Sequence, residues 1–217
     1  MYLYGASGHA RVIMDIVNGN ENCSGDIVEG LFDDNPEVKE LCGVPVEHEY
    51  NGERPLIVSI GNNAIRKRIV EKIVDGIDDF EQQGMDSAMK SPLFGTAVHF
   101  SAVVSPHATI GEGSVVMPGA IINHSAQIGR HCIVNTGASI DHECQIGDFA
   151  HLSPHATLCG NVSVGEGSWV GAGAVVIPGI KIGNWAVVGA GAVVVRDVPD
   201  GVTVVGCPAK ELRKGLL

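Results

Sequence analysis

The apolar positions of residues 98–199 repeat with a period of six. Counted from Val98, the first position of every hexad through Val194 is a branched aliphatic residue, and the fifth is small or β-branched, from Ala102 to Val198. Glycine, asparagine, aspartate and proline gather between these positions. A fixed short period is typical of a solenoid, because each unit buries its apolar face against the next one.

The six-residue unit predicts one short strand and one turn per repeat. The large aliphatic side chain and the small one four residues later both point inward, and glycine or asparagine at the corner supplies a positive φ. Three such sides close a triangular coil of about 18 residues, in which the strands of successive coils stack in parallel. We therefore expect a parallel β-helix over residues 98–199.

Residues 1–80 show a different pattern, in which short apolar strands alternate with helices. This alternation predicts a small parallel α/β domain that is Rossmann-like. Residues 81–97 form a connector, and residues 200–217 are expected to cap the β-helix with a strand, a proline-containing turn and a helix. Within the α/β domain the strands are expected at residues 2–4, 26–32 and 56–60, and the helices at residues 10–17 and 64–74.

Composition and charge narrow the function classes. The formal net charge of −11 argues against a nucleic-acid surface. No stretch is apolar enough to span a bilayer and no signal-type segment opens the chain, so we expect a cytoplasmic protein that does not bind a membrane. Cys132 and Cys144 fall in the small inward position and are expected to be reduced core residues. Positive charge clusters on the second helix, at Arg66, Lys67, Arg68 and Lys72, and at the C-terminus, at Lys210, Arg213 and Lys214.

Three polar loops of the N-terminal domain follow strand ends: GASGH at residues 5–9, Asp33 with Asp34, and Gly61 with Asn62 and Asn63. In open α/β sheets ligands bind at this edge, and a glycine turn that opens a helix offers N–H groups to a phosphate. Each loop also has a structural interpretation, as a packing turn, a solvated turn or a helix N-cap. Together the three loops favour a mononucleotide site over a dinucleotide site.

His142 is the candidate for chemistry within the repeat. It occupies the third position of its hexad, outside the inward-facing pattern, and is flanked by Asp141 and Glu143. A carboxylate beside an imidazole fixes its tautomer and raises its basicity, which suits a general base. His124 lies one coil earlier on the same face, and His151 lies half a coil later, where a neighbouring subunit could bring it close. An exposed solenoid position also tolerates a histidine without function, and this alternative stays open.

Zinc chemistry is a second possibility, because the gamma-class carbonic anhydrases resemble this architecture and place histidine ligands at a trimer interface. Their pattern includes an H-x4-H pair with a third histidine about two coils before it. No such pair is present, since His151 and His155 are four residues apart. We expect no catalytic metal, and no GxSxG or reactive-cysteine motif indicates a covalent nucleophile.

The motifs together resemble a known family. The hexads resemble the hexapeptide-repeat acyltransferases, whose left-handed parallel β-helices form trimers and bind acyl-CoA between subunits. A narrower group, the sialic-acid O-acetyltransferase-like sugar acetyltransferases, is resembled by five motifs of this chain. They are GASGH, FDD, IGNN before a basic helix, IDHEC and a terminal VGCPAK. Within this group the sequence is most similar to the N-acetyltransferases that act on UDP-linked 4-amino-4,6-dideoxy sugars in bacillosamine biosynthesis.

The resemblance implies a role for each matching residue. His142 would be the general base that takes a proton from the sugar amine, and Glu143 would orient it. Asn135 and His151 would line the active site. The nucleotide sugar would be held by Gly5, Ser7, Gly8, Asp33, Asp34, Gly61 and Asn62. Acetyl-CoA would be bound by His151, Gly160, Ala172, Gly189, Ala190 and Lys210.

The resemblance also implies the reaction and the assembly. It implies a homotrimer with active sites between subunits. The enzyme would transfer acetyl from acetyl-CoA to the amine of a nucleotide-linked aminosugar. The transfer would be direct and would take place within a ternary complex. The favoured substrate is UDP-4-amino-4,6-dideoxy-N-acetylglucosamine. Two alternatives stay open: O-acetylation of a sugar hydroxyl, as in sialic-acid modification, and a non-catalytic solenoid scaffold.

Overall fold

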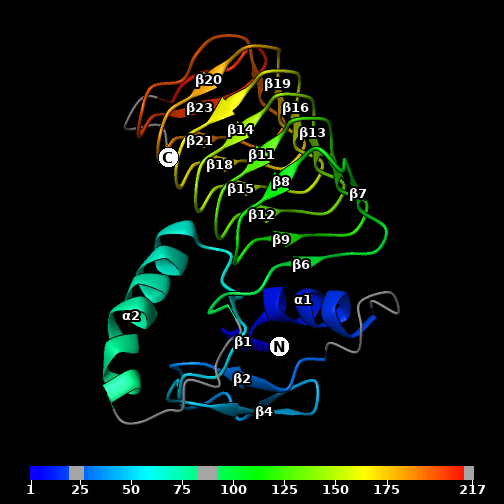
Figure 1. Ribbon diagram of the computed structural model, residues 1–217. Coiled ribbons are helices and arrows are strands. Elements are labelled where there is room, and N and C mark those ends of the chain that lie inside the picture. Colours follow the sequence, from blue (N-terminus) through cyan, green and yellow to red (C-terminus); the bar gives the residue numbers. More distant parts are fainter. Residues whose placement is uncertain (20–26, 83–91, 213–217) are drawn as a thin grey trace.

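A computed structural model describes residues 1–19, 27–82 and 92–212 of the 217-residue chain. A stack of triangular coils stands over a smaller α/β domain (Figure 1). The expected mixed fold, an α/β domain followed by a parallel β-helix, is confirmed. The left-handed sense of the coils remains what the family resemblance implies.

The N-terminal domain is a five-stranded sheet with a helix on each face. Its elements are β1 (Tyr2–Tyr4), α1 (Gly8–Gly19), β2 (Gly30–Phe32), β3 (Glu40–Leu41), β4 (Val44–Glu47), β5 (Leu56–Val58) and α2 (Asn63–Gln82). The strands pair in the order β3-β4-β2-β1-β5, and all pairs except β3–β4 are parallel. Because side chains alternate along a strand, Leu3 packs with α1 whereas Tyr4 packs with α2.

The predicted elements of this domain are present with shifted ends. The strands at residues 2–4 and 56–60 and both helices are confirmed, and α2 runs further than residue 74. Strand β2 begins at Gly30, later than predicted, and residue 26 lies outside the described residues. The β3–β4 pair was not predicted, because two such short strands show no readable period.

Above this domain, short strands pair in parallel with strands one coil later, as Ile121 pairs with Ser139 and Ser139 with Thr157. The predicted coil length is therefore confirmed. The strands are β6 (Ala97–Val98), β7 (Val103–Val104), β8 (Thr109–Ile110), β9 (Val115–Val116), β10 (Ile121–Ile122), β11 (Gln127–Ile128), β12 (Ile133–Val134), β13 (Ser139–Ile140), β14 (Gln145–Ile146), β15 (His151–Leu152), β16 (Thr157–Leu158), β17 (Ser163–Val164), β18 (Trp169–Val170), β19 (Val175–Val176), β20 (Lys181–Ile182), β21 (Val187–Val188), β22 (Val193–Val194), β23 (Thr203–Val205) and β24 (Lys210–Glu211).

Three sheets form the sides of the stack. The docked sheet contains β6, β9, β12, β15, β18, β21, β23 and β24, and α1 covers part of its outer face at Val115 and Ile133. The aliphatic sheet contains β7, β10, β13, β16, β19 and β22, and Val103 and Ile121 are exposed on its outer face. The polar sheet contains β8, β11, β14, β17 and β20, with outward side chains such as Gln145.

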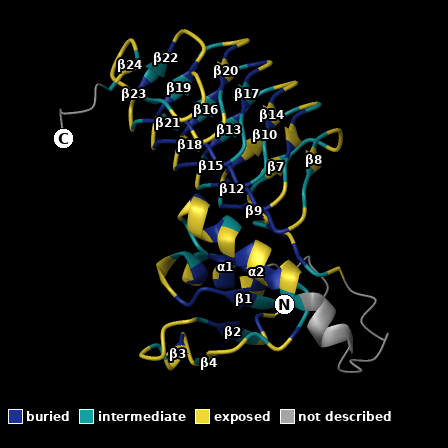
Figure 2. Cartoon of the chain, turned by 90° about the vertical axis from the view of Figure 1, so that its left-hand side faces the viewer, coloured by how far each residue is buried: buried dark blue, intermediate teal, exposed yellow. Residues whose placement is uncertain are grey.

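The side chains that the hexad pattern assigns to the interior of the stack form one buried cluster. Buried residues, coloured dark blue, recur along the coils (Figure 2). First-position residues such as Ile140 and Leu158 are fully buried, and so are fifth-position residues such as Ala138. Pairing large with small side chains suits the narrow triangular cross-section. Cys132 and Cys144 are buried free thiols in the small position, as predicted, and burial raises the pKa of Cys132 to about 12.

The fourth position of most hexads turns the corner with a positive φ. Glycine takes this position at Gly113 and Gly137, as the pattern predicts. Other corners use residues with a side chain, for which the left-handed conformation costs about 1–2 kcal/mol per residue. These residues are Ser125, His131, Glu143, Phe149, His155, Asn161 and Trp185.

Each end of the stack carries a strand pairing that was not predicted. At the start, Phe94 pairs with Leu56 of the α/β sheet before the chain enters β6, while residues 83–91 of the predicted connector lie outside the described residues. At the end, β23 continues the docked sheet and β24 pairs with it antiparallel. Residues 200–212 contain no helix, and within them the antiparallel strand β24 covers this edge. Residues 213–217, where the expected cap helix would end, lie outside the described residues.

Candidate active site

His142 lies at the corner between β13 and β14, on the edge that joins the aliphatic sheet to the polar sheet. Its Nδ1 is 3.1 Å from Oε2 of Glu143. Adjacent side chains on a strand diverge, but Glu143 adopts a φ of 61°, and this corner conformation allows the two side chains to meet. When Nδ1–H donates to the carboxylate, Nε2 keeps a lone pair for a proton. The predicted pairing is present, and the catalytic role of the pair stays a prediction.

Gly160 of the next coil lies directly against the His142 ring. A Cβ built on Gly160 would be 2.5 Å from Nε2, so glycine is what leaves the ring room in this position. One coil before, the His124 carbonyl accepts the Glu143 N–H at 3.0 Å, and the His124 ring lies 4.4 Å from that of His107. His124 and His142 therefore occupy neighbouring corners of one edge, as their spacing predicts.

His151 belongs to another side of the coil. It opens β15 in the docked sheet and is buried, with Nε2 3.1 Å from Nδ2 of Asn135. Its ring stacks on Trp169 at 5.8 Å, and Nε1 of Trp169 donates to Ser153 Oγ at 2.6 Å. The structure thus brings Asn135 and His151 together, and it places them on a different edge from His142 of the same chain.

A pocket of about 410 Å³ joins His151 to the N-terminal domain. Its lining includes Gly61 and Asn62 from the loop before α2, and Trp169 and Trp185 from the coils. Two groups predicted from separate motifs, the nucleotide-sugar loop and a histidine expected to bind acetyl-CoA, therefore meet in one pocket. The tryptophans were not predicted to take part, because nothing in their hexads distinguishes them from other outward side chains.

The three polar loops of the N-terminal domain lie at one edge of its sheet, as predicted. Oδ2 of Asp33 accepts the Ala6 N–H at 2.7 Å and so holds the GASGH loop in place. Gly5 has a φ of 108°, and a Cβ there would be 2.8 Å from Ile60. Ser7 and Gly8 are exposed at the start of α1. The backbone of this loop is therefore accessible where a phosphate would bind.

Like Asp33, two further predicted nucleotide-binding side chains have partners within the chain. Oδ1 of Asp34 accepts the Tyr4 hydroxyl at 2.6 Å and lies 3.4 Å from Nζ of Lys72. Oδ1 of Asn62 accepts the Ile65 N–H at 3.0 Å, which makes Asn62 the N-cap of α2. The structural interpretation of Asn62 is confirmed, and the binding role of both residues stays a prediction.

The residues predicted to bind acetyl-CoA lie on two edges of the stack. Gly160 shares the edge of His142, and Lys210 is exposed in β24 at the end of the docked sheet. The coils approach closely on the second edge, where a Cβ on Gly171 would be 2.6 Å from the backbone of the next coil. The small residues that follow β18 and β21 on this edge are Ala172, Gly189 and Ala190.

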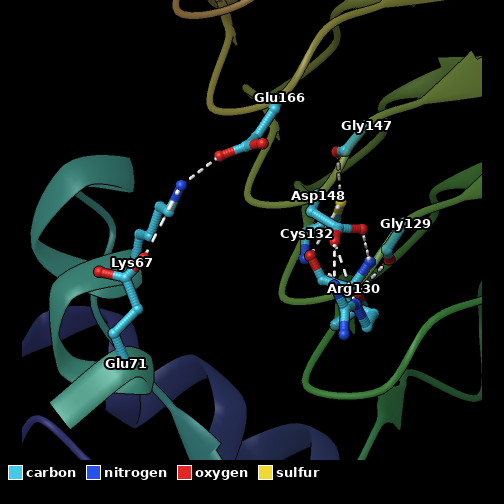
Figure 3. A network of polar contacts seen from close by, with 9 residues as sticks. Lys67, Glu71, Gly129, Arg130, Cys132, Gly147, Asp148 and Glu166 are labelled. Carbon is cyan, nitrogen blue, oxygen red and sulfur yellow. Dashed lines mark hydrogen bonds and ion pairs between the residues drawn. The ribbon is translucent and has the colours of Figure 1, made fainter.

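Lys67 of α2 faces Glu166 of the coils (Figure 3). Nζ of Lys67 is 2.5 Å from Oε1 of Glu166 and 3.8 Å from Oε1 of Glu71. The guanidinium of Arg130 donates two hydrogen bonds, of 2.8 and 3.0 Å, to Oδ2 of Asp148 one coil later. The Lys67–Glu166 pair ties α2 to the coils and so helps to hold the Gly61 loop beside His151.

Arg66 is separated from the basic cluster to which the sequence analysis assigned it. Its side chain is 1% exposed, whereas Arg68 and Lys72 are exposed. Helical spacing would have predicted that Arg66 is buried, because Arg66, Ile69 and Ile73 share one buried face of α2.

Three histidines near the contact between α2 and the coils are uncharged at neutral pH. Burial, and then the charge of Arg66, lower the pKa of His9, His131 and His151 from 6.5 to about 4. Below pH 6.5 the unfolded chain binds protons that the folded chain does not take up until about pH 4. The stability that these groups provide is therefore complete above pH 6.5 and is lost as the pH falls toward 4.

We accordingly expect the free energy of unfolding to decrease steadily from pH 6.5 to 5, a window above the titration of ordinary carboxylates. Urea denaturation at a series of pH values measures it. His131→Gln should flatten the slope, because one of the three titrating groups is removed. An equal slope in wild type and variant would contradict the account.

Metal and membrane features are absent from the described residues. Within residues 1–19, 27–82 and 92–212, no three histidine, cysteine or acidic side chains gather as a metal site. No helix in the same part of the chain has the length and apolar character needed to cross a membrane. His155, the second member of the pair considered for zinc, lies against Gly137 of the preceding coil.

Parallel coils built from hexads, with a histidine–carboxylate pair at a corner, define the class of the hexapeptide-repeat acyltransferases. Comparison with known proteins agrees with this class. Residues 107–142 and 161–196 match the family model of the bacterial transferase hexapeptide (six repeats). Residues 1–73 match the model of the PglD N-terminal domain.

Solved structures extend the likeness to the whole chain. PerB from Caulobacter crescentus, in complex with CoA and GDP-perosamine, is 38% identical with a TM-score of 0.83, over 98% of this chain and 96% of that chain. The acetyltransferase domain of PglB from Neisseria gonorrhoeae, in complex with acetyl coenzyme A, is 32% identical with a TM-score of 0.80, over 97% and 98%. This chain therefore belongs to the hexapeptide-repeat sugar N-acetyltransferases that carry a PglD-type N-terminal domain.

A curated relative is similar over a shorter stretch. UDP-N-acetylbacillosamine N-acetyltransferase from Bacillus subtilis is 42% identical over 121 residues, which are 53% of this chain. The match spans only 50% of that relative's length. That relative is named for a UDP-linked aminosugar.

Proposed function

We propose that this chain transfers acetyl from acetyl-CoA to the amine of a nucleotide-linked aminosugar, with UDP-4-amino-4,6-dideoxy-N-acetylglucosamine as the favoured substrate. The observation that carries the proposal is the His142–Glu143 pair. His142 is exposed, and its Nε2 lies against Gly160 of the next coil. PerB was crystallised with a GDP-linked aminosugar, and the Bacillus subtilis relative is named for a UDP-linked one. The choice of uridine follows the name of the Bacillus subtilis relative, which is 42% identical over 53% of this chain, and the substrate screen described below separates uridine from guanosine.

The mechanism assigns one task to each member of the pair. Glu143 holds Nδ1–H, so Nε2 of His142 accepts a proton from the sugar amine as the nitrogen attacks the thioester carbonyl. A C–N bond forms, the C–S bond breaks, and the leaving thiolate takes the proton back from His142. Glu143 stabilises the imidazolium between these two transfers, much as an acidic partner does in a catalytic triad. Asn135 and His151 line the acetyl end of the site.

The site is completed between subunits of a homotrimer. The aliphatic sheet offers the contact surface, since Val103 is 64% and Ile121 39% exposed, while α1 covers part of the docked sheet and the third sheet is polar. Cyclic packing on this face brings the edge with Asn135 of one chain beside the edge with His142 of the next. His142 and His151, which are apart within one chain, then face the same cleft.

Mixed trimers test this arrangement. His142→Ala and His151→Ala chains are each expected to be inactive, but random mixing should restore about one quarter of the wild-type sites, because each mixed interface can pair two intact histidines. The two proteins are unfolded together, refolded and assayed by thiol release, with separately refolded samples as controls. Activity no higher than in those controls would contradict a shared site.

A substrate screen tests the activity itself. UDP-, TDP-, GDP- and CMP-linked aminosugars are incubated with acetyl-CoA, and free thiol is followed. Transfer to a UDP-aminosugar supports the proposal. Tighter binding of CMP than UDP, with acetylation of a sialic-acid hydroxyl, would favour the O-acetyltransferase alternative, and no consumption of acetyl-CoA with any sugar would favour the scaffold.

A further inference from the structure

Arg66 is a fully buried cation without a carboxylate partner among the described residues. Its donors go to oxygens of three separate segments. Nε donates to the His131 carbonyl at 2.9 Å, and Nη2 donates to the Phe149 carbonyl at 2.7 Å. Nη1 donates to the Ile60 carbonyl at 2.8 Å. One guanidinium thus bonds two successive coils and the strand end that leads into the Gly61 loop.

Asn63 completes the same junction. Its Oδ1 accepts Nη2 of Arg66 at 2.9 Å, while its Nδ2 donates to the carbonyls of Gly167 and Ser168 at 3.0 and 3.3 Å. Arg66 and Asn63 together therefore tie the start of α2 to three successive coils. Asn63 also lines, together with Gly61 and Asn62, the pocket that contains His151.

We propose that Arg66 is a positioning residue, which together with Asn63 fixes the nucleotide-sugar loop at residues 61–62 relative to His151. The inference rests on the proposed function, because it concerns how the two substrates are aligned. The loop belongs to the α/β domain, whereas the acetyl-CoA edges belong to the coils. Alignment of amine and thioester therefore requires a fixed join between the domains, and a small displacement there is costly for reaction.

Packing alone does not account for this arginine. Burying a cation is expensive, and an apolar side chain of similar volume often stabilises as well or better. The planar guanidinium group has five N–H donors in a fixed geometry and can bind several carbonyls at once, which the ammonium group of a lysine cannot do in the same way. The charge is also close enough to lower the pKa of His9 on the GASGH side and of His151 on the coil side. Arg66 thus lies between the two halves of the site.

Arg66→Lys and Asn63→Ala test the inference, with Arg68→Lys as the matched control on the exposed face of the same helix. Steady-state kinetics are measured against the nucleotide aminosugar that the wild type accepts and against acetyl-CoA. We expect about a tenfold rise in KM for the sugar nucleotide and a fall in kcat, with KM for acetyl-CoA within about twofold. The control should match wild type. Asn63→Ala gives the readout if Arg66→Lys does not fold.

The outcomes separate this inference from the proposed function. Equal changes in both KM values, or a lower melting temperature with unchanged kinetics, would overturn the positioning role while leaving the activity standing. An inactive wild type would contradict the proposed function instead. In that case calorimetry with UDP and GDP decides the role of Arg66: about tenfold weaker binding in Arg66→Lys than in Arg68→Lys supports it, and equal binding overturns it.

Discussion

Replacing His142 with alanine is expected to lower turnover by about two orders of magnitude or more, the usual contribution of a general base. The fold should not change, because the imidazole is exposed and its removal leaves no buried group unpaired. Thiol release at saturating substrates measures the turnover. Light scattering and thermal melting on the same preparation establish that assembly and stability are retained.

The matched control is His107→Ala, which removes another exposed imidazole two coils away on the repeat. Its turnover should stay within about twofold of wild type, as expected for a surface change away from the site. Glu143→Gln should lie between the two, since the amide can still contact Nδ1 but cannot stabilise an imidazolium. Turnover close to wild type in His142→Ala would overturn the assignment of the base.

The fold was predictable nearly to single residues wherever a period governs it. Ile140, Leu158 and Ala138 are buried because each hexad repeats the same environment, so one rule places all of them. The corners were predictable only where glycine occupies them. At Glu143 or Trp185 the left-handed conformation is imposed by bonds to the preceding coil, such as Glu143 N–H to the His124 carbonyl, and residue type does not reveal it.

In the candidate site, too, contacts between residues close in the sequence were predictable and contacts between distant segments were not. The His142–Glu143 pair was predictable because the two residues are adjacent and one corner joins them. The pocket between Gly61 and His151 was not, because it depends on how two domains dock. Arg66 shows the difference most clearly: the sequence grouped it with the basic residues of the second helix, whereas the docking of α2 onto the coils buries it alone.

Gly160→Ala is the second substitution with a large expected effect on turnover. Gly160 lies outside the left-handed region, so alanine brings no backbone strain, but its Cβ would be 2.5 Å from Nε2 of His142. The exposed ring can swing away at little cost in stability, and the base is then misplaced. We expect turnover to fall by about tenfold to a hundredfold, in line with an error of about 1 Å in placing a reacting group. The melting temperature should not change.

Gly19→Ala is the control for this substitution, because a Cβ at Gly19 meets no atom within 4 Å. A double variant then separates two causes. If Gly160→Ala acts by displacing His142, adding it to His142→Ala lowers the residual rate no further. If it acts by obstructing acetyl-CoA on that edge, the two effects multiply and KM for acetyl-CoA rises. Since the built Cβ lies nearest to the imidazole, non-additivity is the expected result, and multiplied losses would show that the coenzyme occupies this corner.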